Sequence, residues 1–254
     1  MYILKNAEQL LKYCGSVGIF IKDTVYFMLT RRHNLKIVLK EIVSIGIESF
    51  FLVSLISFFV GIIIAFQTAS FLKQFSSEIY ISSLVGLSLV RELGPVLGSL
   101  IVAARSGAAI TAGIGAMKIS EQVDALEAFA VNPIDYLVVP KFISLLFSMP
   151  LLVIYGGCLG IFGGYVVGAA KFSIPFNLYF QMTFESLQYK DIVSGLIKSV
   201  CFGSIIALIS AFEGFRPQSS ADVSKAVQMS VVRSFLLIII CDCILTALFY
   251  FILA

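Results

Sequence analysis

The sequence predicts an all-α membrane protein. We expect an N-terminal amphipathic helix at the membrane interface, then five transmembrane helices, with a short cytoplasmic helix between the second and third. Two observations predict this class. Of the 254 residues, 59% are hydrophobic and only 13% are charged, whereas soluble domains carry about 25% charged residues. The apolar residues also form runs of the ~20 residues that a helix needs to cross a bilayer.

Composition also excludes several classes of protein. The net charge is only +3 and the basic residues are scattered, so nothing indicates a nucleic-acid partner. The five cysteines have no CxxC spacing and lie mostly in apolar runs, which favours buried thiols over a metal or disulfide role. We see no removable signal peptide at the N-terminus.

The first expected unit is residues 1–40. Its first 30 residues place apolar side chains at three- and four-residue steps, with charged side chains between them. This segment is too polar to cross a membrane, and its basic face suits anionic headgroups, so we expect a helix lying flat in the interface. A helix packed on a partner subunit is the alternative. A basic flank follows and contains the only histidine, His33, which we expect to be solvated.

The second expected unit, residues 41–254, contains five predicted spans at about 42–66, 79–117, 142–169, 192–212 and 231–253. The second apolar stretch is longer than one span requires, so it must tilt, extend beyond the membrane or break. Gly94-Pro95 is the expected break, because proline removes a helix donor. Glycines recur at every fourth position from Gly156 to Gly168, which lets another backbone approach the third span closely. We expect an aromatic connection at 171–191 on the far surface and a polar loop at 213–226.

The distribution of lysine and arginine predicts the orientation. With a cytoplasmic N-terminus, three basic residues lie outside (Lys73, Lys171 and Lys190) and twelve lie inside: Lys5, Lys12, Lys22, Arg31, Arg32, Lys36, Lys40, Lys118, Lys141, Arg216, Lys225 and Arg233. Five spans then place the C-terminus outside.

Charged residues inside the spans are candidates for function, because each costs ~2.5–3.5 kcal/mol on insertion scales. They are Glu48, Arg91, Glu92, Arg105, Lys198 and Asp242. Arg91 and Glu92 lie about 100° apart on a helix and cannot satisfy each other, so each needs another partner. Arg91 and Lys198 fall toward the outer side and could meet a phosphate. Pairing between helices, for example Arg105 with Asp242, is the alternative.

Residues 119–133 predict a short amphipathic helix with one apolar and one acidic stripe. Ser120 is the expected N-cap, and Asn132-Pro133 is the expected end. The acidic stripe contains Glu121, Asp124 and Glu127, and the apolar stripe contains Ile119, Val123, Leu126 and Phe129 or Ala130. Such a helix, placed just after a span, fits a groove on another protein. An ordinary surface helix is the alternative.

Catalytic and nucleotide-binding motifs are absent from the sequence. There is no GxxxxGK[ST], HExxH or GxSxG, and the single histidine stands in a basic turn. We therefore expect neither ATP binding by a P-loop nor catalysis by this chain alone.

Four motifs in residues 89–141 resemble the MlaE family, the permease subunits of bacterial lipid ABC transporters that work with MCE-domain proteins. They are RELGP at 91–95, ARSGAA at 104–109, EQVDALEA at 121–128, and VNP at 131–133 with VVPK at 138–141. The resemblance continues through the glycines of the third span, LIKS at 196–199, and Asp242 with Leu245-Thr246. It covers most of the chain from about residue 40 onward.

The resemblance implies a pair of permease copies in the bacterial inner membrane, on two ATPase subunits that bind the ATP, so no cofactor is expected in this chain. A periplasmic MCE-domain protein is a further implied partner, with a small STAS-domain accessory subunit as another. Polar family positions near the lipid path correspond to Arg91, Glu92, Lys198, Lys225 and Asp242. The segment 119–133 corresponds to the coupling helix that docks on the ATPase, through Glu121, Asp124, Leu126, Glu127, Phe129 and Pro133. One departure is Lys225, where arginine is common, in a loop at 213–226 that is shorter than usual.

We therefore expect a permease that moves lipid, glycerophospholipid first, between the inner membrane and a periplasmic carrier, serving outer-membrane lipid asymmetry or lipid trafficking. A sterol or another hydrophobic cargo is an alternative within the transporter class. A membrane-embedded enzyme that modifies lipids is a rival of another class, which activity of the isolated chain would favour. A further rival is a scaffold that only anchors an ATPase or an MCE protein. An assembled complex that moves no lipid would favour this rival.

Overall fold

The computed structural model describes residues 2–31, 34–75 and 77–253; Arg32 and His33 of the basic flank lie outside these ranges. All regular structure in the described ranges is helical. The α-helices are α1 (Tyr2–Thr30), α2 (Leu35–Leu72), α3 (Ile81–Ser88), α4 (Gly94–Val102), α5 (Ala108–Ile119), α6 (Gln122–Ala128), α7 (Val139–Phe172), α8 (Phe176–Ser186), α9 (Tyr189–Gly214) and α10 (Ser220–Leu253). Short 3-10 turns are η1 (Lys73–Phe75) and η2 (Glu78–Tyr80), and π-helical turns are η3 (Leu89–Leu93), η4 (Ala103–Gly107) and η5 (Ile134–Val138).

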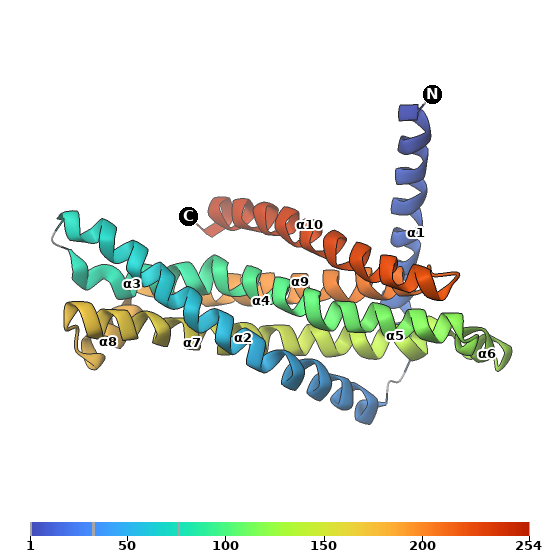
Figure 1. Cartoon of the computed structure of the whole chain (residues 1–254), viewed down its shortest axis with the longest axis horizontal. Helices are drawn as coiled ribbons and strands as arrows, with labels where there is room; N and C mark the ends of the chain where they lie inside the picture. Colours follow the sequence, from blue (N-terminus) through green and yellow to red (C-terminus); the bar gives the residue numbers. More distant parts are fainter. Residues whose placement is uncertain (1, 32–33, 76, 254) are drawn as a thin grey trace.

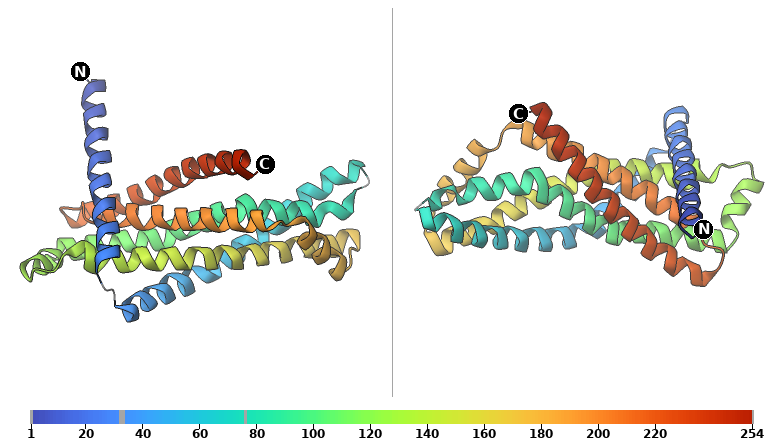
Figure 2. Two further views of the ribbon diagram at one scale, coloured as in Figure 1. Left: turned by 180° about the vertical axis from the view of Figure 1, so that it is seen from behind. Right: turned by 90° about the horizontal axis from the view of Figure 1, so that it is seen from above.

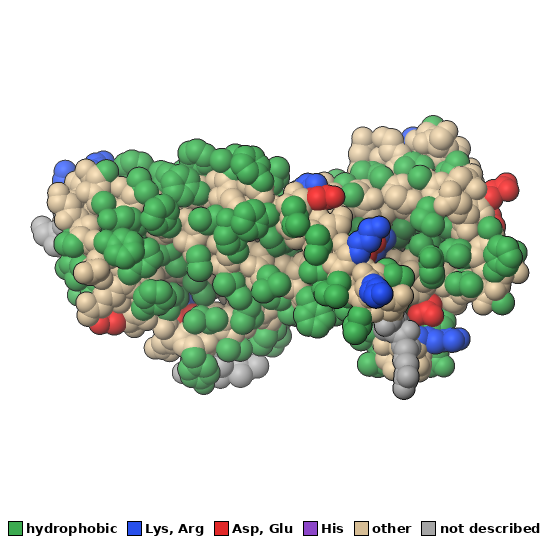
Figure 3. Space-filling view, turned by 90° about the horizontal axis from the view of Figure 1, so that it is seen from below, with side chains coloured by type: hydrophobic (Ala, Val, Ile, Leu, Met, Phe, Trp, Pro, Cys, Tyr) green, Lys and Arg blue, Asp and Glu red, His purple; other side chains and the backbone are tan. Residues whose placement is uncertain are grey.

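Within the described residues, five helical segments are long and apolar enough to cross a membrane: Leu35–Leu72, Ile81–Ile119, Ile134–Phe172, Tyr189–Gly214 and Ser220–Phe251. The predicted all-α fold with an N-terminal helix and five spans is confirmed. Figure 3 shows one face of the molecule covered mainly by hydrophobic side chains, with few charged groups among them. Large apolar side chains such as Phe51 and Phe59 of α2 are exposed, as is expected of side chains that contact lipid.

The five spans run along the long axis of the molecule, with α2 and α10 on opposite faces (Figures 1 and 2). Helix α6 lies at one end of the bundle, and α8 lies at the other end beside the start of α3. Helix α1 stands roughly across the long axis, near the end that carries α6. This is the direction that a helix in the membrane plane requires beside spans that cross the membrane.

The second span bends without breaking at Gly94-Pro95. Pro95 cannot donate to the carbonyl of Arg91, and the amide of Gly94 donates instead to the carbonyl of Leu89, five residues back. The resulting π-helical turn η3 accommodates the proline, and a second π-helical turn, η4, follows α4. The predicted break is therefore wrong, because the helix widens over one turn where Pro95 lacks a backbone N–H and then continues.

The glycines of α7 bring two neighbours close, as predicted. A Cβ atom at Gly156 would lie 2.8 Å from the hydroxyl of Ser57 in α2, and the carbonyl oxygen of Gly160 would lie 1.9 Å from a Cβ at Gly61. Farther along, a Cβ at Gly164 would lie 2.5 Å from the hydroxyl of Tyr179 in α8. Tyr179 is fully buried, and this burial raises the pKa of its phenol. The glycine ladder thus packs α7 against the span α2 at one level and anchors α8 at the next.

Candidate functional site

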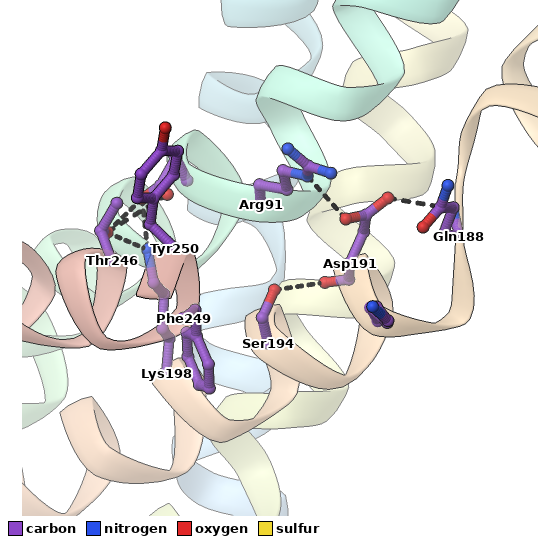
Figure 4. Close-up of a pocket in the computed structure, with 10 residues that line it drawn as sticks. Arg91, Gln188, Asp191, Ser194, Lys198, Thr246, Phe249 and Tyr250 are labelled. Carbon is purple, nitrogen blue, oxygen red and sulfur yellow. Dashed lines mark hydrogen bonds and ion pairs between the residues drawn. The ribbon is translucent and has the colours of Figure 1, made fainter. Parts of the chain in front are cut away.

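A cavity of about 300 Å³ lies between η3, α9 and the C-terminal part of α10, toward the end of the bundle that carries α8 (Figure 4). Both polar and apolar side chains line it: Arg91, Glu92, Gln188, Lys190, Asp191, Ser194, Lys198, Thr246, Phe249 and Tyr250. Three of the five residues predicted near the lipid path are among them, namely Arg91, Glu92 and Lys198. Asp242 lies beside the cavity and contacts Lys198.

The π-helical turn η3 places two adjacent charges toward different neighbours. Arg91 reaches the start of α9, where its Nε donates to Asp191 Oδ1 over 2.6 Å. Glu92 meets Lys198, which lies about two turns farther along α9. The expectation that neighbouring charges on this helix cannot satisfy each other and take separate partners is confirmed.

Asp191 joins the turn η3 to the beginning of α9. It is 4% exposed, and its second oxygen, Oδ2, accepts a hydrogen bond from the backbone amide of Gln188 over 3.0 Å. The side chain of Gln188 accepts in return from the backbone amide of Asp191, which completes a capping box. One buried carboxylate therefore caps α9 and holds Arg91.

Lys198 is the centre of a closed charge cluster. It is 1% exposed, although Lys is almost never fully buried without partners. Its Nζ is bonded to Glu92, lies 2.7 Å from Thr246 Oγ1 and lies 2.9 Å from Asp242 Oδ1. Glu92 and Thr246 accept hydrogen bonds from this ammonium, whereas Asp242 Oδ1 lies at ion-pair distance without a hydrogen bond. Three neighbours thus hold Lys198 inside the cavity wall, where it presents almost no surface to a ligand.

Arg91 differs from Lys198 in what remains available. Its side chain is 53% exposed, and only Nε is engaged, so Nη1 and Nη2 have no hydrogen-bond partner among the described residues. The planar fork of an arginine suits a phosphate. The cavity can therefore accept an anionic oxygen group at Arg91, next to the apolar surfaces of Phe249 and Tyr250.

Other predicted charges lie away from this cavity. Lys225 is 78% exposed near the start of α10, where it lies 3.5 Å from Asp222, and it does not line the cavity. The pairing of Arg105 with Asp242 is wrong, because Arg105 lies on η4 and bonds Glu48 of α2 over 2.8 Å. Which charges pair depends on how deep in the membrane each one lies along its span, and the sequence alone does not give that depth.

Glu213 was expected in a polar loop, and this placement is wrong. It lies in the last turn of α9, 1% exposed, and forms ion pairs with Arg216 and Arg233. Tyr13 of α1 donates to Glu213 Oε1 over 2.8 Å, and Arg233 lies 4.3 Å from the centre of its ring. Burial and the bond to Glu213 raise the pKa of Tyr13 to about 12.

The segment at 119–133 forms a shorter helix than predicted. Helix α6 covers only Gln122–Ala128. Ser120 is not its cap, because its hydroxyl donates back to the carbonyl of Ala116, and Glu121 turns the chain with a left-handed φ of 57°. Asn132 accepts from the amide of Ile134 and so begins the next helix rather than ending α6.

The predicted docking residues of this segment have different exposures. Val123 is buried and Leu126 half-buried, so they hold α6 to the bundle, and Pro133 is buried as well. Phe129 is 80% exposed, and Glu121, Asp124 and Glu127 are exposed. Asp124 pairs with Lys118 of α5 over 2.6 Å, which ties α6 to the span that carries Arg91.

Sequence reasoning missed Asp191 and Thr246 as cavity residues. The spacing of Gln188 and Asp191 before an apolar run is a capping-box signature and could have marked the start of α9. Thr246 lies in the stretch that resembles the MlaE family, but the apolar pattern of α10 indicates no role for its side chain, because a threonine in an apolar helix more often bonds its own backbone.

Comparisons with known proteins agree with this architecture. The family model described as "Permease MlaE" matches residues 38–248. A probable ABC transporter permease protein of Rickettsia prowazekii is 39% identical over 252 residues, with 94% of each chain covered. The intermembrane phospholipid transport system permease protein MlaE of Haemophilus influenzae is 34% identical over 248 residues, covering 97% of this chain and 95% of its own.

A more distant relative comes from a plant. The chloroplastic protein TRIGALACTOSYLDIACYLGLYCEROL 1 of Arabidopsis thaliana is 31% identical over 236 residues, covering 92% of this chain and 67% of its own. The family match includes part of each of the five spans, from residue 38 in the first turn of α2 to residue 248 in α10, and so includes Thr246 of the cavity. The chain therefore belongs to the MlaE permease family.

Proposed function

We propose that this chain is the permease subunit of an ABC transporter that moves glycerophospholipid between the inner membrane and a periplasmic MCE-domain carrier. The observation that carries the proposal is the cavity at η3, in which Arg91 keeps both terminal nitrogens unengaged beside apolar side chains. A phospholipid combines the two matching groups, a phosphate and hydrocarbon.

A second hollow supports a lipid cargo. An apolar groove of about 170 Å³ is also bordered by η3 and α9, through Leu89, Val90, Gly195 and Leu196. The same two elements thus present charge to one hollow and hydrocarbon to another. The names of two relatives point to the same class, since the Haemophilus protein is named for phospholipid transport and the Rickettsia protein as an ABC permease.

ATP hydrolysis belongs to a partner in this proposal, and α6 is the element that meets it. The exposed Phe129 and the exposed acidic residues Glu121 and Glu127 form its outward surface. Closure of the ATPase would push α6, and the Lys118–Asp124 pair would pass the movement to α5. Along this span the π-helical turn η4 follows α4 and precedes α5, and a second π-helical turn, η3, carries Arg91 itself. π-Helical turns frequently occur at functional sites and bend helices, so they are the places where the span would shift.

The same proposal fixes the placement in the membrane. The N-terminus and α6 lie in the cytoplasm, and the cavity opens toward the periplasm, with residues 1–40 as the interfacial unit and 41–254 as the permease unit. The excess of Lys and Arg at the α6 end supports this orientation. A second copy of the chain, two ATPase subunits and an MCE-domain protein complete the complex, with a STAS-domain subunit as a further partner.

Purification from native membrane in mild detergent, followed by mass spectrometry of proteins and lipids, tests the assembly and the cargo class. We expect an ATPase, an MCE-domain protein and bound phospholipid. Co-purification of a sterol without phospholipid would contradict the cargo. A chain that retains no ATPase after gentle crosslinking would contradict the role of α6.

Substitution of Arg91 tests the headgroup contact. We expect Arg91→Ala to weaken phospholipid binding by about tenfold or more, because a hydrogen bond to a charged group contributes about 1.5–3 kcal/mol. Lys225→Ala is the matched variant, since Lys225 is also cationic but lies outside the cavity. Unchanged binding in Arg91→Ala, or an equal loss in Lys225→Ala, would remove Arg91 from the role assigned here.

A further inference from the structure

Asp191 occupies an unusual position at the edge of the cavity. Its carboxylate is almost fully buried, yet it bonds an arginine side chain that is half exposed. Both of its oxygens are engaged, Oδ1 by Arg91 and Oδ2 by the amide of Gln188, as Figure 4 shows. Its charge also lies in the first turn of α9, where the helix dipole compensates a negative charge.

The contact with Arg91 is made at one point. Asp191 accepts from Nε and from neither terminal nitrogen, so the carboxylate holds the base of the guanidinium group and leaves its outer fork unengaged. Because the guanidinium is planar, a bond at Nε restricts where Nη1 and Nη2 can point. A free arginine would instead lose considerable rotamer freedom when it bound a ligand. The ion pair is therefore arranged to preorganise Arg91 rather than to neutralise its binding face.

We propose that Asp191 is a positioning residue that sets the preference of the cavity for lipids bearing a phosphate, by aiming the terminal nitrogens of Arg91 into it. This inference rests on the proposed function and deepens it, because it separates two roles among the charges at η3. Lys198 closes the wall with Glu92, Thr246 and Asp242. Arg91, held by Asp191, contacts the headgroup.

The test compares two probes with the same acyl chains, phosphatidylethanolamine and diacylglycerol, which differ in the phosphate-bearing headgroup. Binding to the full chain, purified with its co-purifying subunits, is measured by native mass spectrometry. In the unaltered protein we expect phosphatidylethanolamine to be preferred. In Asp191→Asn we expect this preference to fall by about tenfold, close to the loss of rotamer freedom that Asp191 prevents, while diacylglycerol binding stays within about twofold.

The asparagine variant isolates the contact to Arg91. Its single carbonyl oxygen can still accept from the amide of Gln188 and cap α9, but its amide nitrogen then faces Arg91 Nε and cannot accept from it. If Asp191 only capped the helix, Asp191→Asn would keep the preference, and Asp191→Ala would lower the binding of both probes and the midpoint of thermal unfolding together. That result would overturn the inference.

Two further variants keep the test decisive if Asp191→Asn does not fold. Arg91→Lys retains the charge but lacks the planar fork that Asp191 holds at Nε, so we expect it to lose the preference to the same extent as Asp191→Asn. In a background of Arg91→Ala, Asp191→Asn should cause no further loss. A preference that survives in Arg91→Lys or in Asp191→Asn overturns the positioning role alone. Absence of any preference in the unaltered protein overturns the proposed headgroup site itself.

Discussion

Two charge clusters at opposite ends of the bundle use similar residues in different ways. At the η3 end, Asp191 and Lys198 are buried and join α9 to η3 and α10, and a cavity lies beside them. At the α6 end, Glu213 is buried and joins α9 to α10 and to α1. Each cluster links three elements through one or two buried charges.

The clusters differ in what lies beside their arginines. Glu213 accepts from Tyr13, Arg216 and Arg233, and Arg233 also lies over the ring of Tyr13, but these side chains line neither of the two hollows described above. At η3, Arg91 faces a cavity with two nitrogens unengaged. Burial of a charge in a span is thus not sufficient to mark a binding site. An unengaged donor beside a hollow is the distinguishing feature.

The largest expected effect comes from Glu213→Gln, which removes the charge that holds two arginines. Breaking a buried ion pair by removing one partner costs about 3–5 kcal/mol, and we expect a loss near 3 kcal/mol because Arg216 is half exposed. Unfolding in detergent, followed by circular dichroism, measures the loss. Phospholipid binding by the folded fraction should be unchanged. Lost binding without lost stability would mean that the α6 end belongs to the lipid path.

Lys198→Met should have a smaller effect, of about 2 kcal/mol, since it strands Glu92 and Asp242 but both are partly exposed. The triple variant with Glu92→Gln and Asp242→Asn removes the stranded charges, and we expect it to recover most of the stability. The preference for phosphatidylethanolamine over diacylglycerol should persist in the triple variant, because Arg91 and Asp191 are retained. Loss of that preference would show that Lys198 contacts the headgroup.

Much of the fold follows from sequence because the bilayer leaves few choices. Apolar runs of sufficient length predict spans, and the four-residue glycine spacing from Gly156 to Gly168 predicts a close approach of backbones. The residues at which helices begin and end are harder to predict from sequence. Ser120 and Asn132 both carry capping side chains, but each serves the neighbouring helix rather than the one predicted.

The site was predictable only in part for a related reason. Arg91, Glu92 and Lys198 attract attention because charges in spans are costly, and they do meet at one cavity. Their partners depend on how far each helix is shifted along its axis, which no local pattern records. Asp191 and Glu213 were overlooked because both stand at the ends of a span, where a carboxylate is unremarkable in sequence but buried in the structure.

The smallest effect concerns the attachment of α1. Tyr13→Phe removes the hydrogen bond to Glu213 but keeps the ring under Arg233, so we expect a loss of about 1 kcal/mol near pH 8. The pKa of Tyr13 is raised from 10.0 to about 12 in the folded chain, so the unfolded chain ionises first as the pH rises. The stabilisation by neutral Tyr13 is complete below pH 10 and is lost progressively as the pH approaches 12. The difference in unfolding midpoint between the unaltered chain and Tyr13→Phe should therefore shrink when measured at pH 8, 10 and 11. A difference that stays constant across these values would mean that Tyr13 is not held by the buried carboxylate, and the attachment of α1 through Glu213 would be wrong.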